Sequence, residues 1–202
     1  YCPTSGGVNG CPGGVGNRKA APADGAWAET INCILAGQVG MAIAMSDAVI
    51  QAIEGSGPFE GEAPATDLRA MMGLWPNYCQ LVTTADSGIK KFEDLKGKRV
   101  GVGAPNSGVE VNARMMFEAH GMTYKDCRVD YLSYGEAIDQ MKNGQCDAAF
   151  VTSGLGNATI RELGVTKKIA FVPIEGEARK KLIEKYPFYI EAVIPASVYG
   201  TA

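Results

Sequence analysis

The sequence predicts an α/β protein in which short strands and helices alternate. Three observations lead to this fold class. Short apolar runs are separated by turn residues, Ser-x-x-Glu capping boxes follow two of these runs, and Gly or Asn-Gly ends the helical patterns that the boxes open. Such alternation is typical of parallel sheets, in which ligands bind at the carboxyl ends of the strands.

In the first part of the chain, turn residues separate helical patterns from strand-like runs. Residues 8–24 are rich in Gly and Pro and predict a loop. Further along, Ser46 is placed to cap a helix. The expected elements are a helix at 30–35, a strand at 39–44, a helix at 46–53, a loop at 55–65, and strands at 68–74 and 80–84.

The next segment combines a strand, a break and a capped helix. A strand is expected at 99–102, and Ala104-Pro105-Asn106 interrupts it. Ser107 therefore stands at a helix N-cap, and Glu110 completes a capping box in which the hydroxyl and the carboxylate each hold one backbone N–H. The free N–H groups of a helix N-terminus carry a partial charge of about +0.5 and suit a carboxylate or phosphate. Most caps bind nothing, so a purely structural role for Ser107 stays open.

The second half continues the alternation. The helix that Ser107 begins is expected to end near Gly121. A second capping box, Ser133 to Glu136, opens a helix that stops at Asn143-Gly144. Further strands are expected at 129–132, 148–151, 169–173 and 190–198.

Composition and charge exclude several classes of protein. A net charge of −3 and a pI near 5.3 leave no basic footprint for nucleic acid. No apolar run reaches the roughly 20 residues that a membrane-spanning helix needs. With one His and no Cys-x-x-Cys pair, the chain lacks a plausible zinc set, and neither a metal nor a cofactor is expected.

The six cysteines leave the redox compartment open. An even count fits an oxidising compartment, although buried free thiols are equally ordinary. Cys127 and Cys146 precede two strands of one predicted domain and form the most plausible disulfide pair.

Several motifs follow one another in order from about residue 26 to the C-terminus. They are Ser46-Asp47 with Gly55-x-Gly57-Pro58-Phe59, D-S-G-I-K and D-L-K-G-K-R-V within 86–100, G-A-P-N-S-G-V-E at 103–110, Y-L-S-Y-G-E-A at 131–137, D-A-A-F-V-T-S-G-L-G-N-A at 147–158, and K-Y-P-F-Y at 185–189. This ordered set resembles the solute-binding proteins of TRAP transporters of the TAXI type. Three positions depart from the family pattern: Met45 replaces Gln, Ile50 replaces an aromatic residue, and Gly156 replaces Pro.

The resemblance implies an α/β, type II periplasmic binding-protein fold, with two α/β domains, a ligand cleft between them and a hinge. The first domain would comprise residues 1–85 and 187–202, and the second residues 86–186. Hinge strands are expected near 80–85 and 189–194. The family's opening strand and closing helices are not recognisable, so the first domain is expected to be incomplete and the chain a fragment.

The same resemblance places ligand-binding residues at the turns that face the cleft. Each of these residues has an alternative role in capping or in turn formation. The expected ligand-binding residues are Tyr1 and Thr4 in the opening segment, Ser46 and Asp47 in the first domain, and Asn106, Ser107, Gly108, Val109, Thr152, Ser153 and Asn157 in the second.

The function that the resemblance implies is a periplasmic receptor for a small carboxylate of the glutamate, glutamine or 2-oxoglutarate type, which it delivers to the subunits of a TRAP membrane permease. Asp47 would repel a dicarboxylate and suit the ammonium of an amino acid. Alternatively, Asp47 supports a helix N-terminus by about 0.3–1 kcal/mol. Two other classes stay open: a ligand-sensing domain of a regulatory protein, and an enzyme on the same fold.

Overall fold

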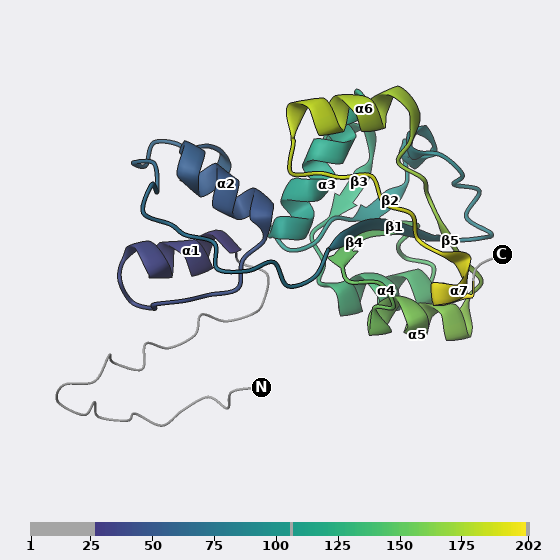
Figure 1. Ribbon diagram of the computed structural model, residues 1–202. Coiled ribbons are helices and arrows are strands. Elements are labelled where there is room, and N and C mark those ends of the chain that lie inside the picture. The colour runs from purple at the N-terminus through teal and green to yellow at the C-terminus, as the bar shows by residue number, and fades with distance from the viewer. Residues whose placement is uncertain (1–26, 106, 201–202) are drawn as a thin grey trace. The chain divides into compact units, whose positions relative to one another are not determined.

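The computed structural model describes residues 27–105 and 107–200 (Figure 1). The chain divides into two compact units, Tyr1–Ala65 and Thr66–Ala202. No helix among the described residues is both long and apolar enough to cross a bilayer. The domain boundaries near residues 85 and 186 that the family resemblance implies stay a prediction.

Within residues 27–65, the first unit has two short helices, α1 (Trp27–Leu35) and α2 (Ser46–Glu54), and one 3-10 turn, η1 (Gly57–Phe59). Gly55 ends α2 in the left-handed region, at a φ of 65°, where the absence of a Cβ removes the steric penalty. The N–H groups of Gly55 and Ser56 both donate to the carbonyl of Gln51. This C-cap turns the chain sharply into η1.

Two expectations for the first unit are wrong. Residues 39–44 form no strand, and no strand occurs between residues 27 and 65. A strand needs a neighbouring backbone for its hydrogen bonds, which apolar character alone does not supply. Ser46 is the first residue of α2 rather than its cap: Met45 is the N-cap, and no side chain caps the helix.

The second unit contains a five-stranded sheet in the order β3-β2-β4-β1-β5. β2 pairs in parallel with β3 and β4, whereas β1 pairs antiparallel with β4 and β5. Four strands therefore run in one direction, and β1 runs the opposite way between two of them. The strands are β1 (Tyr78–Thr84), β2 (Arg99–Gly101), β3 (Arg128–Asp130), β4 (Ala148–Ser153) and β5 (Ile169–Phe171).

This sheet confirms the predicted α/β class, and each of its strands overlaps a run that the sequence predicts. The reversed strand β1 lies where the first hinge strand is expected, near 80–85, and its hinge role stays a prediction. Its interior position gives it a hydrogen-bonded neighbour on each side.

Helices cover both faces of the sheet (Figure 1). α3 (Gly108–Ala119) and α6 (Gly176–Lys185) pack on one face, and α4 (Tyr134–Lys142) and α5 (Ala158–Thr166) on the other. Because side chains alternate along a strand, Leu81 and Val82 enter different cores. The remaining short elements of the unit are η2 (Phe92–Leu95), η3 (Tyr124–Asp126) and α7 (Ala196–Tyr199).

Two predicted strands of this unit are wrong. Residues 68–74 form no regular element, and residues 190–198 give an unpaired stretch followed by α7. The second hinge strand, expected near 189–194, is therefore absent from the described structure. Met71 and Ile190 are 79% and 78% exposed, so no packing partner holds either segment as a strand. Gly73 is also a poor strand former.

The predicted disulfide between Cys127 and Cys146 is also wrong, because both thiols are free. Cys127 lies just before β3 and Cys146 just before β4, and β2 runs between these two strands. Neighbouring strands lie about 4.8 Å apart, so two strand spacings exceed the roughly 7 Å between Cα atoms that a disulfide can bridge. Each thiol instead donates to a backbone carbonyl: Cys127 Sγ to Leu95 at 3.1 Å, and Cys146 Sγ to Ala148 at 3.1 Å.

Candidate functional site

The candidate site of the second unit lies at the carboxyl edge of the sheet. β2 and β4 are parallel neighbours, so their carboxyl ends lie at the same edge. α3 follows β2 and α5 follows β4, and both helices therefore begin at this edge. The structure brings together six of the predicted site residues here: Ser107, Gly108, Val109, Thr152, Ser153 and Asn157.

The first turn of α3 matches the predicted anion-binding corner in part. Ser107 is the N-cap, and its Oγ accepts a hydrogen bond from the N–H of Glu110 at 3.3 Å. Within residues 27–105 and 107–200, no acceptor contacts the N–H groups of Gly108 and Val109, and none contacts the Ser107 O–H. Two backbone donors and one hydroxyl donor are thus available at this turn.

Gly103 makes the close approach at this turn possible. Its φ of 91° lies in the region that side chains disfavour. A Cβ at this position would lie 2.9 Å from the Val109 Cβ and 3.0 Å from the Ser107 Oγ. The loop after β2 can therefore pack directly against the start of α3 only because residue 103 is glycine.

The capping box at this helix is only half formed, which corrects the expectation for Glu110. Its carboxylate does not reach back to Ser107. Instead it is buried, pairs with Arg114 at 2.6 Å and accepts a hydrogen bond from the Tyr124 hydroxyl at 3.1 Å. Burial and the nearby carboxylate of Glu110 raise the pKa of Tyr124, and the hydrogen bonds that Arg114 donates to Glu110 raise the pKa of Arg114.

The Arg114 guanidinium is therefore bound to the Glu110 carboxylate. Although the side chain of Arg114 is 61% exposed, its charge is paired within the helix. The turn therefore offers neutral N–H and O–H donors and the helix dipole, with no cationic clamp from Arg114. The second box shows the contrast: Ser133 Oγ accepts from the Glu136 N–H at 3.4 Å, and the Glu136 carboxylate accepts from the Ser133 N–H at 2.9 Å.

The last two residues of β4 point to opposite faces of the sheet, and each joins a polar cluster. The α3 cluster consists of Cys79, Asn112, Thr152 and Tyr189. The Thr152 hydroxyl donates to Cys79 Sγ at 3.7 Å, and the Cys79 thiol donates to Asn112 Oδ1 at 3.6 Å. The Tyr189 hydroxyl also donates to Asn112 Oδ1, and the Asn112 amide group donates to the carbonyl of Gly108. Thr152 is thus engaged inside the protein.

The α5 cluster consists of Gln80, Ser153, Asn157 and Tyr199. Gln80 is buried, and its Nε2 donates to Ser153 Oγ at 3.1 Å. The Tyr199 hydroxyl donates to Gln80 Oε1 at 2.7 Å and accepts from the N–H groups of Gly156 and Asn157 at 2.9 and 3.2 Å. A neutral hydroxyl therefore occupies the two N–H groups that precede α5.

Asn157 is the N-cap of α5, which is the structural role left open for it. Its Oδ1 accepts from the N–H groups of Thr159 and Ile160 at 2.9 and 3.3 Å. Gly156 before it has a φ of 76°, which the ring of proline, fixed near −65°, cannot adopt. The replacement of the family's Pro by Gly therefore goes with a different local backbone at this turn.

The other predicted site residues belong to the first unit or to residues outside the description. Ser46 and Asp47 belong to the first turn of α2 in the first unit, where Ser46 is exposed and Asp47 is buried. The Asp47 carboxylate accepts from the N–H of Ala48 at 2.8 Å. Tyr1, Thr4 and Asn106 lie outside the described residues.

Sequence reasoning missed five residues of the two clusters, among them Cys79, which carried no signal of such a role. Gln80 and Asn112 carried a signal, because each is a polar residue on the buried side of an otherwise apolar pattern. Tyr189 belongs to the K-Y-P-F-Y motif, whose contact with α3 the motif itself does not reveal. Tyr199 carried no signal.

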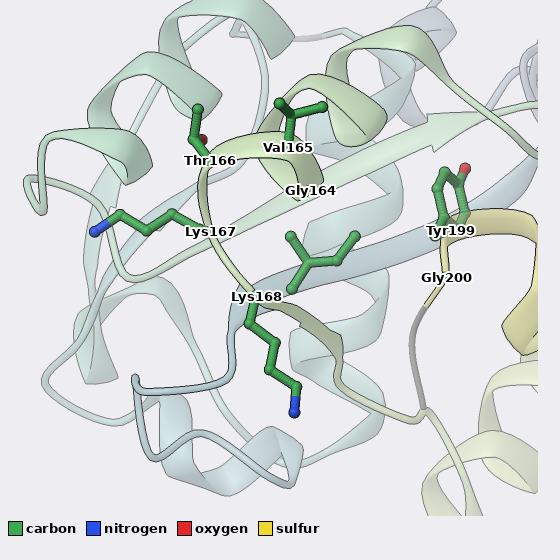
Figure 2. A pocket seen from close by; sticks show the side chains of 8 residues that line it. Gly164, Val165, Thr166, Lys167, Lys168, Tyr199 and Gly200 are labelled. Carbon is green, nitrogen blue, oxygen red and sulfur yellow. The ribbon is translucent and has the colours of Figure 1, made fainter.

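A shallow open hollow of about 360 Å³ lies away from this edge. It is lined by the end of α5, the start of β5, and Tyr199 and Gly200 (Figure 2). No other predicted or observed site residue lines it. The side chains of Lys167 and Lys168 extend in different directions in Figure 2, so they do not converge on one anion.

Part of the chain is similar to parts of three solved structures. The alkanesulfonate-binding protein of Xanthomonas axonopodis pv. citri, bound to MOPS, has 16% identity and a TM-score of 0.46 over 73% of this chain and 47% of that one. The periplasmic aliphatic sulphonate-binding protein of Escherichia coli has 18% identity and a TM-score of 0.41 over 46% and 29%. The substrate-binding protein of a polar amino acid ABC uptake transporter from Streptococcus thermophilus has 23% identity and a TM-score of 0.37 over 48% of this chain and 37% of that one.

The alignments thus span less than half the length of each of these three proteins. The model of the NMT1-like family matches residues 16–202, which is most of this chain. This protein belongs to the NMT1-like family.

Proposed function

We propose that this chain is a periplasmic solute receptor of the TAXI type. It captures a small carboxylate, such as glutamate, glutamine or 2-oxoglutarate, and delivers it to a TRAP membrane permease. The observation that carries the proposal is the first turn of α3, where the N–H groups of Gly108 and Val109 have no acceptor in the described part of the chain. The ordered motifs shared with TAXI-type proteins support the same function.

The chemistry of this turn suits a carboxylate. Its two oxygens accept from the N–H groups of Gly108 and Val109, and the Ser107 O–H supplies a third donor, since its oxygen already accepts from Glu110. Each hydrogen bond to a charged group is worth about 1.5–3 kcal/mol. The dipole of the twelve-residue helix α3 adds to this attraction.

The charge of Asp47 predicts different affinities for the candidate ligands. Asp47 is 5% exposed and lies in the first turn of α2, where a carboxylate stabilises the helix N-terminus. In a ligand site, the same charge would favour an ammonium and disfavour a second carboxylate. Under this proposal, a preference for glutamate over 2-oxoglutarate indicates that Asp47 contacts the ligand, and the reverse preference assigns it to the helix.

The test is calorimetric titration of the full-length mature protein, refolded free of carried-over ligand, with glutamate, glutamine, 2-oxoglutarate and ethanesulfonate. We expect tight binding of at least one carboxylate and no chemical change in the ligand. Absence of binding by folded protein would contradict the proposal, and turnover of the ligand would favour an enzyme on the same fold.

Two matched variants locate the site. Ser107→Ala should weaken binding by about 1–3 kcal/mol, because a charged ligand loses one donor. Ser133→Ala removes the same kind of cap from α4 and serves as the control, since none of the predicted site residues belongs to α4. Equal affinities of the Ser107→Ala variant and the wild type would remove Ser107 from the site.

A further inference from the structure

One segment of the chain, residues 187–200, contributes a tyrosine to each of the two clusters. Tyr189 reaches Asn112 in the α3 cluster, and Tyr199 reaches Gln80 and the start of α5 in the α5 cluster. Residues 187–195 form no regular element. Side chains rather than strand pairing therefore attach this segment to the sheet edge.

On the α3 side, Asn112 connects Tyr189 to the first turn of the helix, and the Tyr189 hydroxyl also lies 3.5 Å from Met115 Sδ. The Tyr189 hydroxyl donates to Asn112 Oδ1, and Asn112 Nδ2 donates to the carbonyl of Gly108. Gly108 supplies one of the two N–H groups of the proposed carboxylate site. Asn112 is 1% exposed, so water cannot readily replace Tyr189 as its partner.

On the α5 side, the connection is direct. The Tyr199 hydroxyl accepts from the N–H groups of Gly156 and Asn157 and donates to Gln80, which in turn holds the Ser153 hydroxyl. Replacing this tyrosine by phenylalanine keeps the ring, which lies 5.2 Å from that of Phe171 between centroids, and removes all three hydrogen bonds.

We propose that Tyr189 and Tyr199 are positioning residues of the candidate site, which tie residues 187–200 to the first turns of both α3 and α5. A shift of this one segment then displaces both turns together. The role of these turns in ligand capture rests on the proposed function, whereas the ties themselves do not.

The first test is hydrogen exchange of the ligand-free protein, measured amide by amide. Tyr199→Phe should speed exchange at Gly156 and Asn157 by about 2- to 10-fold, the effect of a lost hydrogen bond. Tyr189→Phe should do the same at Val111 and Asn112 in the first turns of α3. Unchanged rates at these amides would overturn the proposal.

The matched control is Tyr186→Phe in the same part of the chain. Its hydroxyl donates to the exposed Glu118 at 3.1 Å and reaches neither cluster. This variant should leave exchange at both turns unchanged. Acceleration as large as in the other two variants would show a general loosening of the segment and would also contradict the proposal.

The second test is the affinity of the same folded variants for glutamate and 2-oxoglutarate. The Tyr189→Phe variant should bind the ligand about 2- to 10-fold more weakly than the Tyr186→Phe variant. If Tyr189 only stabilised the fold, its replacement would lower the melting temperature without changing the affinity. Wild-type affinity in both tyrosine variants would overturn the positioning role. If the wild type binds no carboxylate but the tyrosine variants show the expected exchange pattern, the proposed function is wrong, whereas the role of Tyr189 and Tyr199 in holding both turns is supported.

Discussion

Replacement of Gly103 by alanine should strongly destabilise the second unit. The backbone there has a φ of 91°, and a left-handed conformation costs a residue with a Cβ about 1–2 kcal/mol. The new Cβ would also lie 2.9 Å from the Val109 Cβ, closer than real Cβ atoms pack. Overpacking of this kind costs about 1–3 kcal/mol more. We therefore expect the free energy of unfolding to fall by about 2–5 kcal/mol.

Gly88 provides a matched control for the conformational part of this cost. It also has a left-handed φ, of 74°, but no atom lies within 4 Å of the position that its Cβ would take. Gly88→Ala should therefore cost only about 1–2 kcal/mol. Urea unfolding monitored by far-UV circular dichroism gives both values. Equal destabilisation by the two variants would refute the close approach of Gly103 to α3.

Acid should abolish the contribution of the ion pair between Arg99 and Asp147 to the stability of the second unit. Burial tends to raise the pKa of Asp147, but hydrogen bonds donated by Arg99, one of them from its guanidinium at 3.0 Å, outweigh burial and hold that pKa below its usual value. The contribution of this ion pair to the free energy of unfolding is therefore complete above the pKa of Asp147 in the unfolded chain, near 3.9, and is lost as the pH falls through the lower pKa of the folded state. Asp147→Asn should thus lower the free energy of urea unfolding less at pH 3 than at pH 6. An equal decrease at both pH values would contradict this. Burial and the nearby carboxylate of Asp126 raise the pKa of Cys127 to about 11, so its alkylation by iodoacetamide at pH 8 should be far slower than that of glutathione, as mass spectrometry can show; equal rates would contradict the burial of this thiol.

Local signals were predicted best, because their partners are close in sequence. Ser107 and Ser133 cap helices as expected, since each side chain reaches an N–H only three residues away. Glu110 shows where this reasoning fails. Its carboxylate meets Tyr124, which lies in the next element of the chain, and this tertiary partner competes with the local cap.

The polar clusters could not be predicted from the sequence, because they join distant parts of the chain. Tyr199 and Gln80 are 119 positions apart, and Tyr189 and Asn112 are 77 apart. The sheet order that brings Cys79 opposite Thr152 is a property of the whole fold. The same reason explains the failed disulfide prediction, since the strand between Cys127 and Cys146 is known only from the topology.

The strand predictions show a related limit. β1 and β4 succeeded because their apolar residues pack between helices in the centre of the sheet. The runs at 39–44, 68–74 and 190–198 have comparable apolar content but no backbone partner in the described structure. Apolar pattern predicts a strand only where the fold supplies a neighbouring strand.

The most direct test of the central claim is an NMR titration that follows backbone amide resonances of the mature protein as glutamate or 2-oxoglutarate is added. A carboxylate bound at the start of α3 should shift the amide resonances of Gly108 and Val109 strongly. The corresponding amides at the start of α4, those of Tyr134 and Gly135, should stay in place. Saturable binding that leaves Gly108 and Val109 unshifted would contradict the assignment of the carboxylate site to α3.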